Sequence, residues 1–181
     1  MNNNIIGLEV GTIELFPHNI NWKNEFEKEK NRLLPFISEH IKTIEHIGST
    51  SIKDIHAKPI IDMCVGLEKF EDGFKCVEFL EKLGYESLGE FGIKKRHYFR
   101  NNGNTRKFHI HMFEIESYEY KKHIFFRDFM NKNPKEAQEY SNLKLEIKND
   151  ILSNKNLKMD DYTEQKSPFI TLILEKMIER E

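Results

Sequence analysis

The sequence predicts an α+β fold in which a small mixed β-sheet, flanked by helices, is followed by a helical C-terminal segment. Strand-like and helix-like patterns are interspersed over about residues 8–116, whereas every pattern over about residues 117–181 is helical. No linker rich in glycine, proline or serine separates these parts. We therefore expect one domain over residues 1–181, with the helical segment packed on the sheet.

The chain begins with patterns for a strand and a helix. Alternating apolar residues over residues 8–15 predict a strand that ends before Pro17. Asn21 is placed to cap a helix over residues 22–34, and Pro35 is expected to interrupt that helix. The expected inner face of this helix is apolar and consists of Trp22, Phe26, Leu33 and Leu34.

The next segment predicts two strands joined by a turn rich in small and hydroxylated residues. Residues 43–47 predict a short strand that leads to Gly48, and residues 51–56 predict a helical turn. Residues 60–67 form a nearly continuous apolar run, which is typical of a strand buried on both faces.

A helix and three more strands are expected before the helical segment. Residues 70–83 have helical spacing through Phe74 and Leu80, and Gly84 is a plausible stop. The three strands are expected at residues 85–88, 97–100 and 107–114. A run of Asn and Gly over residues 101–104 predicts a hairpin between the last two strands.

The remaining sequence predicts helices only. Their spacing places them at residues 118–130, 134–152 and 162–179. Pro134 fits the first turn of the second of these helices, because a proline there loses no intrahelical hydrogen bond.

Composition excludes several classes of function. The 181 residues are 38% hydrophobic and 32% charged, with a net charge of −2, so a nucleic acid is not an evident partner. The apolar runs are far shorter than the ~20 residues that span a membrane. Cys64 and Cys76 lack metal-ligand spacing, and we expect reduced thiols in a cytoplasmic protein without a signal peptide. The sequence does not indicate an oligomeric state.

The most informative motif joins a hydroxyl-rich turn to a strand that carries one carboxylate. Gly48, Ser49, Thr50 and Ser51 offer backbone N–H groups and hydroxyls to a phosphate, and Asp62 can hold a divalent metal. The alternatives are an ordinary turn with a serine N-cap, and an aspartate that caps a helix or pairs with a buried base. A carboxylate inside an apolar run is costly to bury without a cation or donors, which favours a functional role.

The sequence over residues 44–65 resembles the GrpB family, a branch of the nucleotidyltransferase superfamily. The resemblance extends from about residue 14 to about residue 173. It includes short motifs at 96–100, 109–111, 123–128 and 162–170. It implies that Gly48 and Ser49 hold the terminal phosphates of a nucleoside triphosphate and that Asp62 ligates Mg²⁺. Two departures are Cys64, where the superfamily has a second carboxylate, and Lys53-Asp54, where the family has a Pro-Gly turn.

Two histidines are expected beside Asp62. His109 and His111 share one face of their strand, so they can bind a metal such as Zn²⁺, transfer protons or hydrogen-bond Asp62. We favour the hydrogen bond and regard Zn²⁺ as the weaker alternative to Mg²⁺. Glu114, the nearest acid on that strand, falls on the opposite face.

Several cations are candidates for binding phosphate. Arg96 and Arg100 alternate onto one face of their strand, Lys58 precedes the Asp62 strand, and Lys166 lies near the start of the last helix. The alternatives are a solvent-facing hairpin arm for the arginines and a helix salt bridge for Lys166. We expect His123 and Arg127, four residues apart, to fix their helix to the sheet.

Together these features predict a Mg²⁺-dependent nucleotidyltransferase that moves a nucleotidyl group from a nucleoside triphosphate to a small acceptor. In that case Asp62, His109 and His111 are catalytic. A phosphate-binding module without turnover is the main alternative, because Cys64 replaces an acid. A hydrolase that uses a metal held by the two histidines is a third possibility.

Overall fold

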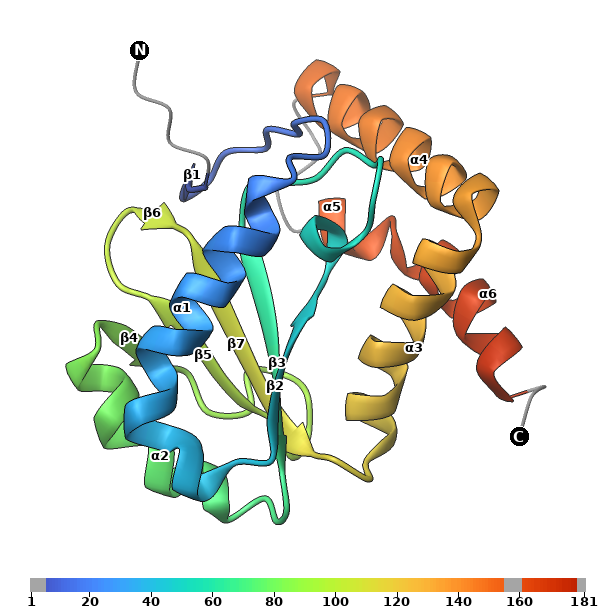
Figure 1. The fold of residues 1–181 in the computed structure, drawn as a ribbon. Helices are drawn as coiled ribbons and strands as arrows, with labels where there is room; N and C mark the ends of the chain where they lie inside the picture. The colour runs from blue at the N-terminus through green and yellow to red at the C-terminus, as the bar shows by residue number, and fades with distance from the viewer. Residues whose placement is uncertain (1–5, 155–160, 179–181) are drawn as a thin grey trace.

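The computed structural model describes residues 6–154 and 161–178 and has the predicted α+β architecture (Figure 1). A five-stranded mixed sheet has the order β2-β3-β7-β5-β4. Its strands are β2 (Thr43–Ile47), β3 (Ile61–Leu67), β4 (Tyr85–Ser87), β5 (His97–Asn101) and β7 (Phe108–Glu114). A separate two-stranded sheet pairs β1 (Leu8–Glu9) with β6 (Thr105–Arg106).

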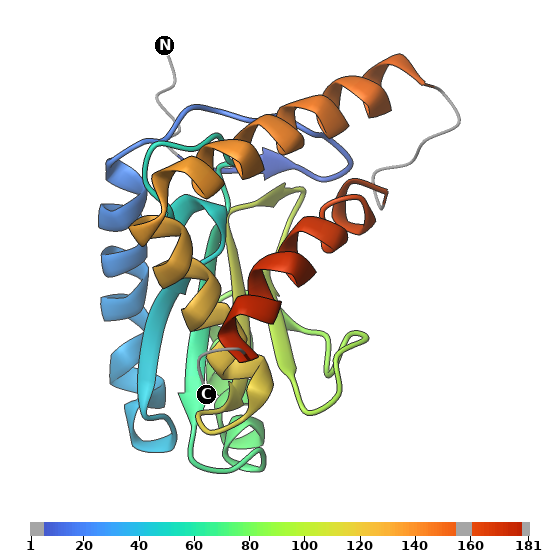
Figure 2. The ribbon, with the colours of Figure 1, turned by 90° about the vertical axis from the view of Figure 1, so that its right-hand side faces the viewer.

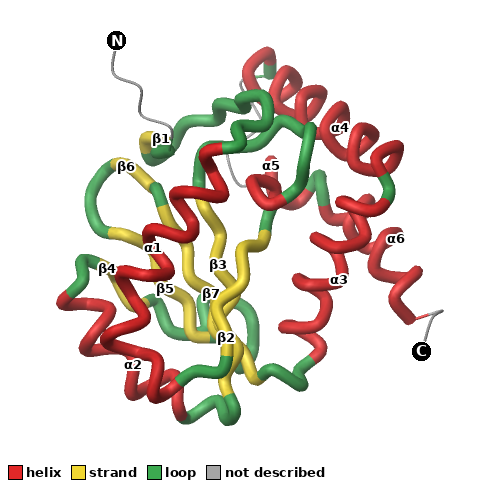
Figure 3. Tube along the Cα trace, viewed as in Figure 1, coloured by secondary structure: helices red, strands yellow, loops and turns green. Residues whose placement is uncertain are grey.

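Helices cover both faces of the large sheet (Figure 2). One face packs against α1 (Asn21–Ile37) and α2 (Asp72–Lys82), and the other packs against α3 (Tyr118–Lys132). The chain continues through α4 (Pro134–Ser153), α5 (Asp161–Glu164) and α6 (Ser167–Ile178), and α6 packs along α3. The tube in Figure 3 shows the strands of the large sheet in the middle of the molecule, with helices on either side. None of the helices in the described ranges is both long and apolar enough to cross a membrane.

The register of the sheet separates an apolar face from a polar one. Strand β3 is parallel to β7, with Asp62 opposite His109 and Cys64 opposite His111, and β5 is antiparallel to β7, with Tyr98 opposite His111. Because side chains alternate along a strand, these residues share the face toward α3. The intervening residues share the face toward α1 and α2.

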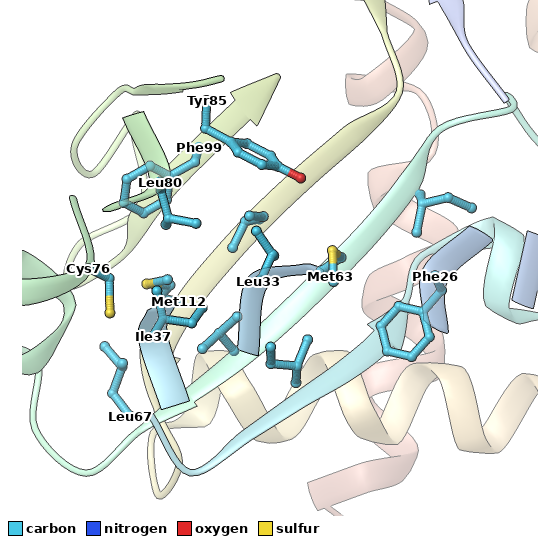
Figure 4. Packing of buried hydrophobic residues seen from close by; sticks show 14 of the residues in the cluster. Phe26, Leu33, Ile37, Met63, Leu67, Cys76, Leu80, Tyr85, Phe99 and Met112 are labelled. Carbon is cyan, nitrogen blue, oxygen red and sulfur yellow. The ribbon is translucent and has the colours of Figure 1, made fainter. Parts of the chain in front are cut away.

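The main core fills the space between the sheet and the helices α1 and α2 (Figure 4). The predicted inner residues Trp22, Phe26 and Leu33 are buried in this core, against Met63 of β3 and Met112 of β7. Both cysteines are free and buried. Phe74, one of the apolar residues whose spacing predicted this helix, is 59% exposed, so the buried face of α2 is narrower than the spacing suggested.

The predicted strand over residues 8–15 was wrong beyond Glu9. A turn follows, in which the Thr12 amide donates to the Glu9 carbonyl, and the chain leaves the strand conformation. Ile13 and Leu15 are nevertheless buried in a small cluster with Ile147 of α4. The alternating apolar residues are therefore explained by the burial of a loop against α4, and not by a strand.

The first helix differs from the prediction at both ends. Asn21 lies inside α1, and the Asn21 amide donates to the Asn19 side chain at 3.0 Å, so Asn19 takes the role expected of Asn21. Pro35 does not interrupt the helix, which continues to Ile37. Proline costs one backbone hydrogen bond near the helix end, and the full burial of Leu33 and Ile37 offsets that loss.

Two further helical boundaries needed correction. The helical turn expected over residues 51–56 is a 3₁₀ turn, η2 (Ser49–Ser51), that directly follows Gly48. The helix expected over residues 162–179 is two helices, α5 and α6, which are separated at residues 165–166. Residue 179 lies outside the described residues.

Candidate functional site

A pocket of about 600 Å³ opens on the polar face of the sheet, which is within the range of about 300–1,000 Å³ typical of small-molecule sites. Its lining comes from the turn after β2, strands β3, β5 and β7, the loop before β5, α3, α5 and the residues that follow α5. Of the site residues predicted from the sequence, all but Ser51 and Arg100 line this pocket.

The phosphate-type turn begins at Gly48, with φ 69° and ψ −175°, a combination that essentially only glycine adopts. The Ser51 hydroxyl donates to the Gly48 carbonyl at 2.7 Å, and the Thr50 hydroxyl donates to the Ile60 carbonyl at 3.3 Å. These two hydroxyls therefore stabilise the turn itself. Ser49 lines the pocket, and its hydroxyl accepts a hydrogen bond from Lys144 of α4.

Asp62 is held by the two predicted histidines. His109 Nδ1 lies 3.2 Å from Asp62 Oδ1, and His111 Nε2 lies 3.8 Å from the same oxygen. Burial alone would raise the pKa of Asp62, but the hydrogen bond from His109 and the nearby N–H of His111 hold it well below its usual range. The carboxylate is therefore ionised at neutral pH. Among the described residues it is the only Asp or Glu that lines the pocket.

The protonation of the imidazoles follows from their neighbours. Arg96 Nη1 lies 3.4 Å from His111 Nδ1, and a guanidinium can only donate, so the proton of His111 sits on Nε2 and faces Asp62. Burial lowers the pKa of His111, which keeps this imidazole neutral. His109 directs Nδ1 to the carboxylate, so its Nε2 is the nitrogen left to accept a proton.

Two lysines flank one aromatic ring at the pocket. Lys58 Nζ lies 4.2 Å and Lys166 Nζ lies 4.4 Å from the ring centroid of Tyr162, which is 2% exposed. Burial lowers the pKa of Lys166 to about 8, with a further contribution from Lys58. Neither lysine has a carboxylate at salt-bridge distance within the described part of the chain. The predicted alternative of a helix salt bridge for Lys166 is therefore not observed.

A third lysine, Lys144 of α4, was missed by sequence reasoning. It is 1% exposed, and its Nζ donates to Ser49 Oγ at 3.1 Å and also to the His56 carbonyl. Burial lowers the pKa of Lys144 to about 7, and the charge of Lys166 adds to this effect. A signal was present in the sequence, because Lys144 follows Ala137, Tyr140 and Ser141 on the buried face of its helix.

We expect Lys144→Met to stabilise the protein most strongly at low pH. The pKa of Lys144 is lowered in the folded state, so its cost to stability begins as the pH falls below the unfolded value of about 10.5 and is complete below about pH 7. In thermal melts at intervals from pH 10 to pH 6.5, the melting temperature of the variant should rise relative to that of wild type as the pH falls. Lys135→Met, on the exposed side of α4, is the control. A constant difference across this range would contradict the prediction.

The arginines have structural partners. Arg96 is 6% exposed, and it donates to the carbonyls of Glu90 and Phe91, so it fixes the loop before β5 while lining the pocket. Arg100 shares the predicted face, but its Nε pairs with Glu86 of β4 at 2.9 Å and it does not line the pocket. Arg100 is therefore removed from the candidate site, because an adjacent strand provides its counter-ion.

One of the two α3 residues expected to fix the helix to the sheet does so, and the other lines the pocket. Arg127 donates to Glu45 and to the His46 carbonyl of β2, so it fixes the helix to the sheet as predicted. His123 instead lines the pocket, and its buried Nε2 has no hydrogen-bond partner within the described ranges. Burial lowers the pKa of His123 to about 3, so this imidazole is neutral.

Cys64 lies on the face of Asp62, as expected, but outside the pocket lining. It is fully buried with Ile47, Phe113 and Tyr120. Burial raises the pKa of its thiol far above the usual range. The position at which the resemblance led us to look for a second carboxylate thus holds a neutral thiol. Glu114 points away, and its Oε1 accepts the Phe70 amide at 3.0 Å.

The donor set limits which metal the site can hold. Asp62 is the one oxygen-bearing acid at the pocket among the described residues, which fits a Mg²⁺ that arrives with a triphosphate and not a pair of protein-held ions. In the described ranges, no group of three or more His, Cys, Asp and Glu side chains is placed to hold a metal ion.

The fold and the pocket together define a small α+β protein with a cation-lined pocket on one face of its sheet. The profile described as "GrpB protein" matches residues 12–176, and the chain belongs to the GrpB family. It is 36% identical over 178 residues to the glutamate-rich protein GrpB of Alkalihalophilus pseudofirmus, covering 96% of this chain and 100% of that protein.

Two further relatives support the family and the fold. The chain is 38% identical over 135 residues to the UPF0157 protein YqkA of Bacillus subtilis, which covers 75% of this chain and 39% of that protein. The crystal structure of conserved protein GrpB from Enterococcus faecalis superposes with a TM-score of 0.83 at 30% identity. That superposition covers 92% of this chain and 98% of the other.

Proposed function

We propose that the pocket binds a nucleoside triphosphate and that the protein transfers its nucleotidyl group to a small acceptor. One observation carries the binding: the Gly48–Ser49 turn, Lys58 and Lys166 line the same pocket, and no carboxylate of the described residues pairs with either lysine. A pair of cations beside a turn of small and hydroxylated residues is suited to a polyphosphate.

The arrangement of Asp62 and His109 supports transfer. The acceptor oxygen attacks the α-phosphorus, the bond from that phosphorus to the bridging oxygen breaks, and pyrophosphate leaves with the electron pair. His109 Nε2 takes the acceptor proton, while Asp62 orients the ring through Nδ1. Mg²⁺ bound with the triphosphate, with Asp62 as its protein ligand, would neutralise charge on the phosphates.

A phosphate-binding module without turnover is the second candidate. Cys64 favours it, because a buried neutral thiol stands where the superfamily places a second acid. A single protein carboxylate provides less charge to hold and position a metal ion.

Calorimetry with the four nucleoside triphosphates, with and without Mg²⁺, tests binding, and an assay of pyrophosphate release tests transfer. Lys166→Met should weaken binding by about 10-fold, whereas Lys135→Met on the exposed side of α4 should not change it. Binding with pyrophosphate release supports the transferase, and binding without release supports the module. Absence of binding by every triphosphate would refute both.

A further inference from the structure

An exposed aromatic side chain lines the same pocket as the phosphate-type turn. Phe91, in the loop between β4 and β5, is 59% exposed. Its φ is 41°, and Lys95 in the same loop has φ 59°. Residues other than glycine adopt such conformations only where the surrounding structure holds them, and these conformations concentrate at functional sites.

Several contacts hold the loop in this conformation. The Phe91 ring stacks on Tyr98 with centroids 5.2 Å apart and planes inclined by 18°, and the Arg96 guanidinium lies 4.6 Å from the centroid of the Tyr98 ring. Arg96 Nη2 donates to the Phe91 carbonyl at 2.6 Å, and the Lys95 amide donates to Glu90 Oε1 at 2.6 Å. The loop is thus fixed to β5 with one face of Phe91 covered by Tyr98.

The exposure of Phe91 leaves its other face open to the pocket. Phe91 differs from the other exposed apolar side chains in that it is fixed by its neighbours and lines the same pocket as the Gly48 turn, where a flat ligand would cover it. A flat heterocycle laid on Phe91 would extend the stack that begins with Tyr98. Aromatic side chains bind bases in this way irrespective of sequence, because every base has a π-face.

We propose that Phe91 is the platform on which the base of the bound nucleotide stacks. The inference rests on the proposed function, since it takes the polyphosphate to lie at Ser49, Lys58 and Lys166. It adds a division of the pocket into two parts, with the base on the loop before β5 and the phosphates on the turn after β2 and the lysines. Stacking alone does not select among bases.

The test compares ATP with inorganic tripolyphosphate, which has phosphates and no base, by calorimetry in the presence of Mg²⁺. Phe91→Ala should weaken ATP binding by about 5- to 150-fold and leave tripolyphosphate binding within about two-fold of wild type. Phe91→Trp should bind ATP at least as tightly as wild type. Phe74→Ala is a matched control, because Phe74 is also 59% exposed but lies on α2, outside the pocket.

The outcomes separate this inference from the proposed function. Equal weakening of both probes by Phe91→Ala, or no weakening of either, would overturn the platform while wild-type binding still supports the proposed function. Failure of the wild-type protein to bind either probe would overturn both. Matched melting temperatures for wild type and both Phe91 variants would show that the comparison reports on the pocket and not on folding.

Discussion

Asp62→Asn is expected to remove the effect of Mg²⁺ on nucleotide binding and to lower pyrophosphate release by at least about 100-fold. Asparagine keeps the shape of the side chain and removes its charge. The carboxylate is the pocket's one acid among the described residues and the hydrogen-bond partner of His109. The substitution therefore removes the charge expected to hold Mg²⁺ and weakens the hydrogen bond that orients the proposed base.

The measurement is calorimetry of ATP binding to wild type and variant, each with and without Mg²⁺. Without the ion, the variant should bind ATP more tightly than wild type, because a negative charge near the phosphates is gone. Asp128→Asn is the control, since Asp128 pairs with Arg127 outside the pocket. A variant whose binding still responds to Mg²⁺ as wild type does would rule out the proposed role of Asp62.

The centre of the site followed from alternation along strands. His109 and His111 were placed on one face by their spacing, and Glu114 on the other, and the register of β3 with β7 then brings the histidines to Asp62. Spacing alone left the pairing open, because the partner of a strand is decided by the whole sheet. The same reasoning placed Arg100 on the correct face of its strand, but it could not show that Glu86 of the neighbouring strand β4 would be its counter-ion.

The residues of the site that the sequence motifs did not predict are brought there by contacts between segments far apart in the chain. Lys144 lies 95 positions after Ser49, and only the packing of α4 brings its amino group to that hydroxyl. Phe91 lies in a loop, where no periodicity predicts which side chain faces a pocket. Helix boundaries failed for a related reason, since buried contacts around Pro35 outweighed a local signal.

Gly48→Ala is expected to destabilise the protein by roughly 2–5 kcal/mol and to abolish ligand binding in the pocket. The backbone of Gly48, with φ 69° and ψ −175°, lies in a region essentially restricted to glycine. A Cβ there would also lie closer than 3.0 Å to Asp62 Oδ2, a contact that side chains essentially never make. Either the turn or the Asp62 carboxylate must therefore move, and both form the site.

Urea unfolding separates the cost of the backbone conformation at Gly48 from the cost of the clash with Asp62. Gly11→Ala is the control, because Gly11 also has a positive φ of 84° but a Cβ there meets no atom within 4 Å. Gly48→Ala should lower the free energy of unfolding more than Gly11→Ala does. The difference between the two losses should be smaller when Asp62 is also replaced by Ala, because the clashing oxygen is then absent. Equal costs for the two glycine substitutions, or an excess independent of Asp62, would show that the turn and the carboxylate are not in contact. A close contact between them is what joins the phosphate-type turn to Asp62, the one acid that lines the pocket in the described ranges.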